Sequence, residues 1–203
     1  MNAIKTMLKK IICILAGLCI VSIITASTTL AQERIEVTNG NVIQHANKFD
    51  IESKSSRFIF PDLTGNNIAI EVEYHGNTRD SSLLGSGKFI SQVGLKLRSV
   101  NQCNLVYVMR RFEPKSEIVV LVKENEGQLS HQECENGGYT KIASIEVPKV
   151  HIGDKFSLET KFVKEQLSII YNGLEIWNGN VQFNHQGNFG VRTDNARVSI
   201  TLK

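Results

Sequence analysis

The sequence predicts an all-β fold, a two-sheet antiparallel β-sandwich, on three observations. Short apolar runs recur along the chain and are separated by Gly, Asn and Asp, which is typical of strands joined by turns. Several of these runs alternate apolar and polar residues with the period of two that marks a half-buried strand. No segment keeps helical periodicity for long. Short strands with one polar face each suit two packed antiparallel sheets.

The first two-thirds of the chain holds the clearest alternating strands. Residues 68–74 place three aliphatic side chains and Tyr74 on one face, and Glu71 and Glu73 on the other. Residues 92–98 likewise place three aliphatic side chains opposite Lys96 and Arg98. Shorter or less regular runs predict further strands at 42–45, 49–51, 57–60, 104–112, 118–123, 143–147 and 156–162.

The C-terminal part of the chain predicts a hairpin followed by two more strands. The dipeptide Asn172-Gly173 lies between two apolar runs, 167–171 and 174–177. Asn-Gly suits a type I′ turn, because both central residues of that turn need positive φ. The remaining strands are expected at 187–192 and 196–202, so the chain ends as sheet.

The first 31 residues have the pattern of a signal peptide. Three lysines precede an apolar run at 11–24, and small residues lead up to a cleavage point after Ala31. We therefore expect one mature domain at 32–203, secreted or periplasmic, with no membrane span after cleavage. An uncleaved membrane anchor is the alternative, because a spanning helix needs about 20 apolar residues and this run is fairly long.

The predicted leader accounts for the net charge of the chain. Lys5, Lys9 and Lys10 are three of the 23 basic residues and the leader has no acidic residue, so its removal leaves 20 basic against 20 acidic residues. A chain without net charge or a block of like charge does not indicate binding to nucleic acid.

Cleavage would also remove Cys13 and Cys19 and leave Cys103 and Cys134. Two cysteines in an oxidising compartment predict one disulfide, which closes a loop of 31 residues. Such a bond stabilises a fold by roughly 3–4 kcal/mol. A zinc site is the weaker alternative, because two cysteines without C-x-x-C spacing supply too few soft ligands.

The order of the strands resembles a known sandwich family. Gly94-Leu-Lys-Leu-Arg98 and Asn104-Leu-Val-Tyr-Val-Met-Arg110 precede the Asn-Gly hairpin, a glycine-led strand and a terminal strand. This order is similar to that of concanavalin A-like or laminin-G-like jelly rolls, from about Ile68 to the end. The resemblance implies a jelly-roll sandwich. That fold hosts lectins, glycosidases, lyases and adhesion modules, so it does not fix the activity.

Trp177 is the first candidate ligand-binding residue. Across a two-residue turn Ile169 pairs with Ile176 and Ser168 with Trp177, which is expected to place Trp177 on the face opposite the core. An aromatic side chain on an open sheet face is the usual platform for a sugar ring. The alternative is that Trp177 packs beneath a loop or the N-terminal segment.

Lys96, Arg98 and Arg110 form a second candidate binding site. The first two share the polar face of one predicted strand, and Arg110 joins them if the next strand is its neighbour. Arginine forks match carboxylate and sulfate, so a uronic or sulfated glycan would fit this face. The alternative is that these are solvated strand charges that oppose edge-to-edge aggregation.

Glu71 and Glu73 are the candidate catalytic residues of an alternative, enzymatic function. They lie about 6.5–7 Å apart on one strand face, and two flanking carboxylates are what glycoside hydrolysis requires. The strand loosely resembles the E-x-D-x-x-E strand of family-16 glucanases. Glu73 stands in place of the Asp, however, and no acid follows at 74–76. No motif of a nucleophile elbow, P-loop or zinc protease is present.

Cofactors receive little support from the sequence. The five histidines are scattered and show no metal-ligand spacing. The predicted loop at 125–140 carries acids and amides that offer oxygens to calcium, but without the spacing of an EF-hand. The loop at 75–88 is long for a hairpin connection, which favours a functional role.

The sequence as a whole therefore predicts an exported, non-catalytic β-sandwich that binds a glycan, such as a cell-surface polysaccharide. Two alternatives stay open. One is a glycoside hydrolase or polysaccharide lyase of the same fold. The other is a structural or adhesion protein of the envelope that binds another protein.

Overall fold

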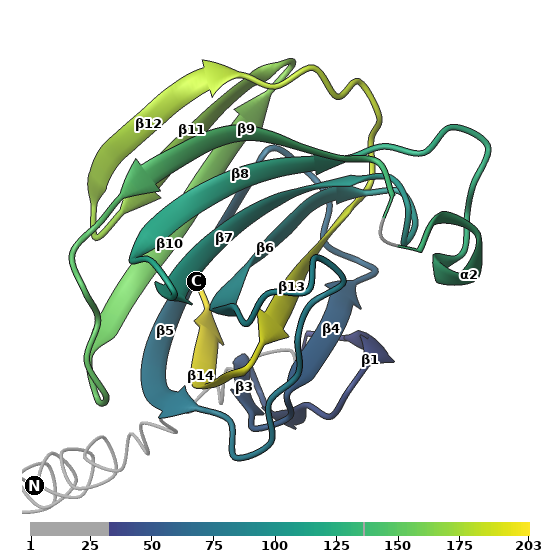
Figure 1. Cartoon of the computed structure of the whole chain (residues 1–203). Helices are drawn as coiled ribbons and strands as arrows, with labels where there is room; N and C mark the ends of the chain where they lie inside the picture. The colour runs from purple at the N-terminus through teal and green to yellow at the C-terminus, as the bar shows by residue number, and fades with distance from the viewer. Residues whose placement is uncertain (1–32, 136) are drawn as a thin grey trace, which may run out of the picture. The chain divides into compact units, whose positions relative to one another are not determined.

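The computed structural model describes residues 33–135 and 137–203, which form two seven-stranded antiparallel sheets (Figure 1). The predicted leader at 1–31 lies outside these residues, so its cleavage and the membrane-anchor alternative stay predictions. Within the described ranges no helix is long and apolar enough to cross a membrane. The predicted two-sheet antiparallel sandwich is confirmed.

Each sheet is named after one of its strands. The β7 sheet has the strand order β1 (Glu36–Asn39), β4 (Ser55–Phe60), β13 (Asn188–Asp194), β6 (Ser91–Ser99), β7 (Leu105–Glu113), β8 (Glu117–Lys123) and β9 (Tyr139–Glu146). The β10 sheet has the order β12 (Leu174–Asn180), β11 (Gln166–Tyr171), β10 (Lys155–Val163), β5 (Asn67–Asn77), β14 (Ala196–Leu202), β3 (Lys48–Ile51) and β2 (Ile43–His45). A single helical turn, α2 (His131–Cys134), lies between β8 and β9.

The main core lies between the two sheets and follows the alternation seen in the sequence. Its members include Ile68, Ile70, Val72 and Tyr74 from β5, Val93, Leu95 and Leu97 from β6, and Val106 and Val108 from β7. Burying one face of the strands in this way supplies the main driving force for the fold.

The central strands of the β7 sheet are also buried on their second face, which the alternation did not predict. All nine residues of β6 are buried. Leu105, Tyr107, Met109 and Val119 form a separate apolar cluster on this side of the sheet. Such satellite clusters form under long loops. The connection at 78–90, which joins β5 to β6, crosses this side of the sheet (Figure 1).

Asn195, in the turn between β13 and β14, fixes the 78–90 connection. Its side-chain amide donates hydrogen bonds to the carbonyls of Ser82, at 2.9 Å, and Ile90, at 3.0 Å. Its Oδ1 accepts the N–H of Ser82 at 2.9 Å, and its carbonyl accepts the N–H of Thr78 at 3.0 Å. Asn195 has a φ of 54°, a region that Asn enters more readily than most residues. Both ends of the connection are thus attached to the sheet.

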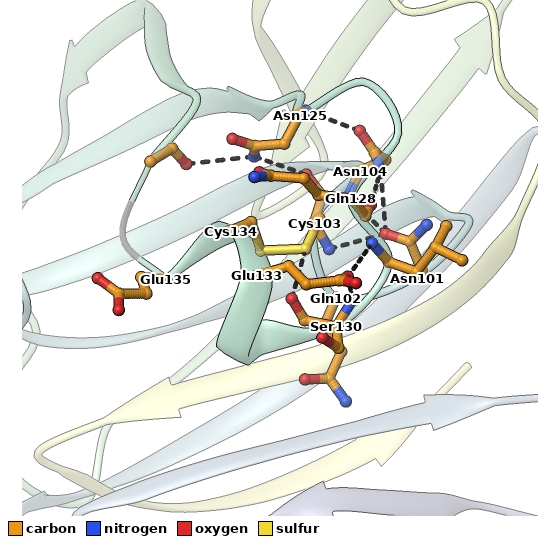
Figure 2. The surroundings of a disulfide bond; sticks show 12 residues. Asn101, Gln102, Cys103, Asn104, Asn125, Gln128, Ser130, Glu133, Cys134 and Glu135 are labelled. Carbon is orange, nitrogen blue, oxygen red and sulfur yellow. Dashed lines mark hydrogen bonds between the residues drawn. A yellow bond between two sulfur atoms is a disulfide. The ribbon is translucent and has the colours of Figure 1, made fainter.

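The predicted disulfide joins Cys103 to Cys134, whose Cα atoms lie 5.8 Å apart (Figure 2). It connects the turn between β6 and β7 to α2. Asn125 adds polar contacts, because its N–H donates to Asn104 Oδ1 at 2.8 Å and its side chain donates to the carbonyl of Cys103 at 3.1 Å. The loop between β8 and β9 is therefore anchored beside the ends of β6, β7 and β8.

Candidate functional site, a basic groove on the β7 sheet

A groove of about 250 Å³ lies on the β7 sheet, on the side turned away from the core. Its sides are formed by residues 82–85 of the 78–90 connection and by Gln102 and His131 near the disulfide. Its floor combines four basic side chains, two tyrosines and one carboxylate: Arg57, Lys96, Lys123, Arg192, Tyr107, Tyr139 and Asp194. We call this site the basic groove.

Strand register brings the floor residues together. Arg192 of β13 pairs with Arg57 of β4, and Gly190 of β13 pairs with Lys96 of β6. Lys96 in turn pairs with Tyr107 of β7. Side chains in register on neighbouring strands point to the same face, so residues far apart in the sequence meet in one site.

Asp194 holds two of the arginines in place. Its Oδ2 accepts hydrogen bonds from Arg192 Nε and Gln92 Nε2, both at 2.7 Å. Its Oδ1 accepts from Arg57 at 3.3 Å and from Ser55 at 3.4 Å. Only 1% of the Asp194 side chain is exposed. Both carboxylate oxygens are thus engaged within the protein.

Arg192 is a buried, permanent cation at the centre of the groove. Its Nη1 donates to the hydroxyl of Tyr139 at 3.4 Å, and its guanidinium carbon lies 5.0 Å from the ring centre of Tyr107. Burial by itself would lower the pKa of Arg192, but Asp194 and the two tyrosines outweigh it and hold that pKa above its ordinary value.

Lys96 is the least compensated charge in the groove. The residue is only 3% exposed, and among the residues that the structure describes its ammonium has no hydrogen-bond or ion-pair partner. Burial, followed by repulsion from Arg57 and Arg192, lowers the pKa of Lys96 from 10.5 to about 8. At pH 7 the ammonium form still outnumbers the amine by about ten to one.

Replacing Lys96 by Met is expected to raise the free energy of unfolding at pH 7 by about 1–2 kcal/mol. The pKa of Lys96 is about 8 in the folded protein and 10.5 in its ordinary state, so the unfolded chain binds this proton more tightly. The resulting cost is fully present below pH 8 and is relieved as the pH rises toward 10.5. The whole pKa shift of Lys96 corresponds to about 3 kcal/mol of destabilisation. Met removes this cost, but its apolar side chain would lie among polar neighbours, so the net gain in stability is smaller.

Thermal and urea unfolding of the wild type and Lys96→Met between about pH 6 and pH 10 measure this effect. The increase in the free energy of unfolding caused by Lys96→Met should shrink as the pH rises. Lys161→Met is the matched control, because Lys161 is exposed on the β10 sheet. A variant that is less stable than the wild type at pH 7 would contradict the prediction.

Lys123 uses its charge to hold the disulfide loop. Its Nζ donates to the carbonyls of Gln102, at 3.2 Å, and Glu135, at 3.1 Å, and lies 3.1 Å from the sulfur of Cys134. It also lies 5.2 Å from the ring centre of Tyr139, with which it pairs across β8 and β9. Lys123 therefore shapes one side of the groove.

Arg98 does not share a face with Lys96, so this part of the predicted cationic site is wrong. The register between β6 and β13 shifts near the end of β6, and Arg98 has a φ of 49°. Its guanidinium consequently turns to the core side, where it donates to the carbonyls of Phe183 at 2.7 Å and Phe162 at 3.1 Å. It also lies 3.6 Å from the ring centre of Phe162.

Arg110 also points away from the groove, although β6 and β7 are neighbours as expected. It pairs with Ile118 and Val93, which face the core. Its Nη2 donates to the carbonyl of Pro148 at 2.7 Å and to Ser116 at 2.8 Å. Arg110 therefore ties the 147–154 connection to the sheet, and the prediction that it joins Lys96 is wrong.

Trp177 packs against the core at the edge of the β10 sheet. A register shift in the hairpin pairs Trp177 with Ile169 and Glu175 with Ile170, whereas regular pairing predicts Ser168 opposite Trp177. The shift turns the half-buried indole toward the core. The predicted open-face position of Trp177 is therefore wrong, and the alternative, packing within the fold, describes the structure better.

Glu71 and Glu73 lie on the outward face of the β10 sheet and not in the basic groove. Glu71 forms an ion pair with Lys203 at 3.1 Å, and Glu73 forms one with Lys155 at 3.5 Å. The main core separates them from the groove, which lies on the other sheet.

The structure assigns no metal ligands within residues 33–135 and 137–203, where no group of three or more His, Cys, Asp or Glu side chains lies close enough to hold an ion. Calcium binding by the 125–140 segment stays an untested expectation.

Of the predicted binding residues, the groove contains Lys96 alone. Arg57, Lys123, Arg192, Tyr107 and Tyr139 were missed. Tyr107 and Lys123 were detectable in principle, because each alternates with core residues on its own strand. Arg57 and Arg192 could not be assigned to one site from the sequence, because they meet only through the pairing of β13 with β4.

No family model matches the chain, and no curated protein matches it. Among solved structures, the carbohydrate-binding module CBM66 from Bacillus subtilis is similar with a TM-score of 0.61 at 14% identity, over 85% of this chain and 94% of that one. The exoplasmic/lumenal domain of VIP36, in a form with Ca²⁺ and Man bound, is similar with a TM-score of 0.53 at 13% identity, over 83% of this chain and 82% of that one. Likeness at such low identity concerns the fold. The chain thus has a jelly-roll β-sandwich fold similar to the folds of these structures, as its strand order predicted.

Proposed function

We propose that this domain is an exported, non-catalytic carbohydrate-binding module that binds glycan in the basic groove. The observation that carries the proposal is the groove itself. In it, arginine and lysine donors and two tyrosine rings meet on the outer face of the β7 sheet, between two anchored loops. The names of the two similar structures, a carbohydrate-binding module and a mannose-bound domain, support the same function.

The groove offers both kinds of contact that a sugar ring needs. Tyr139 is 40% exposed and stacks at 6.3 Å on the buried ring of Tyr107, so it presents an apolar surface to a ligand. Lys96 and the partly exposed Arg57 supply hydrogen-bond donors for hydroxyl oxygens. A mostly preformed pocket with a few oriented polar groups is the usual form of a small-ligand site.

The carboxylate content of the groove favours binding over hydrolysis. Glycoside hydrolysis generally needs two carboxyl groups that flank the scissile bond. Asp194 is the one carboxylate among the described residues that line the groove, and its oxygens are occupied by Arg192, Arg57, Gln92 and Ser55. It positions cations and has no free oxygen for acid–base work.

Export to the periplasm or the cell exterior is part of the proposal. The disulfide between Cys103 and Cys134 supports it, because such bonds persist mainly in oxidising compartments.

Retention of glycans by the purified protein tests the function. Glycan arrays and insoluble polysaccharides would be probed with calcium and with a chelator, and released reducing sugar would be scored in parallel. We expect retention without release. Release that disappears in Glu71→Gln or Glu73→Gln would establish the enzymatic alternative. Co-purification with another protein that soluble sugars do not displace would establish the adhesion alternative.

Replacing Tyr139 by Ala is expected to weaken glycan binding by about 1–2 kcal/mol, because the ligand loses its exposed aromatic surface. Trp177→Ala is the matched control, since Trp177 packs against the core of the other sheet. It should lower the melting temperature and leave the affinity of the folded protein unchanged. Titration calorimetry and thermal unfolding of both variants measure the two effects. Loss of binding in Trp177→Ala, with Tyr139→Ala unaffected, would move the site to the hairpin.

A further inference from the structure

The charges of the basic groove do not balance. Arg57, Lys96, Lys123 and Arg192 are basic, and Asp194 is the only acidic residue among the described residues that line the groove. A low-dielectric cleft lined mostly by one sign of charge concentrates ligands of the opposite sign. The groove is therefore built to attract an anion, although the mature chain as a whole was expected to be neutral.

Three of the four cations already have partners within the protein. Arg57 and Arg192 bind Asp194. Lys123 donates to two backbone carbonyls near the disulfide. Lys96 differs from all of them, because its ammonium lacks any partner among the described residues and the residue is only 3% exposed.

An ammonium that ends a largely buried side chain and has no partner within the protein is costly, and proteins normally pair such a group. Lys96 lines the groove, so its donors are accessible to a ligand there. Its neighbour on β13 is Gly190, which has no side chain to cover it. Arg192 lies two residues further along β13, where it pairs with Arg57 of β4. An oxyanion beside Lys96 would therefore meet three cations.

The size of the groove limits the ligand. Its volume of about 250 Å³ is below the roughly 300–1,000 Å³ of pockets for drug-sized ligands. One sugar unit with its charged substituent suits this space better than several units laid side by side.

We propose that the basic groove selects an acidic saccharide unit, whose carboxylate or sulfate ester binds Lys96 between Arg57 and Arg192. This proposal rests on the proposed carbohydrate-binding function. A carboxylate and a sulfate ester share the chemistry that three converging cations recognise, a compact oxyanion on a sugar ring.

Titration calorimetry with matched saccharides tests the selectivity. The probes are D-glucuronate, its neutral methyl ester, D-glucose 6-sulfate and D-glucose, with acetate and sulfate ions as anions without a sugar ring. We expect one or both acidic sugars to bind at least tenfold more tightly than their neutral counterparts. The stronger of the two identifies the natural substituent as carboxylate or sulfate.

Lys96→Met should abolish this preference, so that acidic and neutral sugars bind to the variant with equal, weak affinity. Lys161→Met, on the β10 sheet, is the matched control and should bind like the wild type. Backbone amide shifts in a nitrogen-15 spectrum locate the ligand independently, and we expect them to change at Lys96, Tyr107 and Arg192.

The pH dependence provides a readout that a structural role of Lys96 would not produce. The charged and titratable groups nearest to Lys96 are Arg57 on β4, Glu36 on β1, Tyr107 on β7, and Arg192 and Asp194 on β13, and the groove also contains Lys123 on β8, His131 on α2 and Tyr139 on β9. Lys96 has the lowered pKa, about 8, so affinity for the acidic sugar should fall as the pH rises through that value. Lys96→Met should show no such fall.

The remaining outcomes separate the two proposals. Equal binding of acidic and neutral sugars would overturn the acidic selectivity and keep the carbohydrate-binding function. Binding of acetate or sulfate as tightly as the acidic sugars would show an anion site that does not recognise sugar, which overturns both. Absence of binding to every probe would also overturn both.

Discussion

Replacing Asp194 by Ala should lower the free energy of unfolding by about 3–5 kcal/mol, because it leaves buried charge without a partner. Arg192 would lose its ion pair at 2.7 Å, and only 9% of its side chain is exposed to water. Gln92 would lose its acceptor in the same buried site. The loss thus combines an uncompensated guanidinium with an unsatisfied amide.

Urea unfolding of Asp194→Ala, Asp194→Asn and Asp62→Ala tests this result. Asn keeps the shape and one acceptor oxygen, so its loss should be intermediate. Asp62 pairs with Arg34 at 2.9 Å, but both side chains are more than half exposed. Removing an exposed pair costs about 0–1 kcal/mol. If Asp194→Ala lowered the free energy of unfolding no more than Asp62→Ala, the ion pair between Asp194 and Arg192 would contribute no more to stability than an exposed pair.

Removing the disulfide should cost about 3–4 kcal/mol, since the unfolded chain regains the freedom of a loop between Cys103 and Cys134. The double variant Cys103→Ser, Cys134→Ser should also bind glycan more weakly. Lys123 touches the sulfur of Cys134 and the carbonyls on both sides of the bond, so the side of the groove loosens when the bond is absent.

Unfolding of the double variant, compared with the wild type in oxidising and reducing buffer, measures the stability effect. The reduced wild type should match the double variant, which shows that the bond and not the serine side chains is responsible. A double variant within about 1 kcal/mol of the oxidised wild type would show that hydrogen bonds such as those of Asn125 hold the loop alone.

Local patterns in the sequence were sufficient for the fold and for the environment of single strands. The alternation at 68–74 correctly separated core residues from Glu71 and Glu73, and the alternation at 92–98 correctly placed Lys96 away from the core. Only two cysteines of the sequence lie outside the predicted leader, which was sufficient to predict the disulfide between Cys103 and Cys134. Each of these inferences depends only on residues that are close in sequence or few in number.

The predicted positions of Arg98 and Trp177 failed because one register shift reverses every later side chain on its strand. Regular alternation places Arg98 beside Lys96, but the shift at the end of β6 turns it to the core. The shift in the β11–β12 hairpin does the same to Trp177. Such shifts arise from tertiary packing, which a strand pattern does not contain.

The position of β13 has a consequence for how the protein matures. This strand comes from residues 188–194 and lies between β4 and β6, which begin more than 90 residues earlier. A chain that emerges N-terminus first therefore leaves the β7 sheet split until residues 188–194 arrive. Contacts between such distant segments form slowly. Arg57 and Lys96 meet Arg192 only when β13 inserts between β4 and β6, so the basic groove forms late in the folding of the domain.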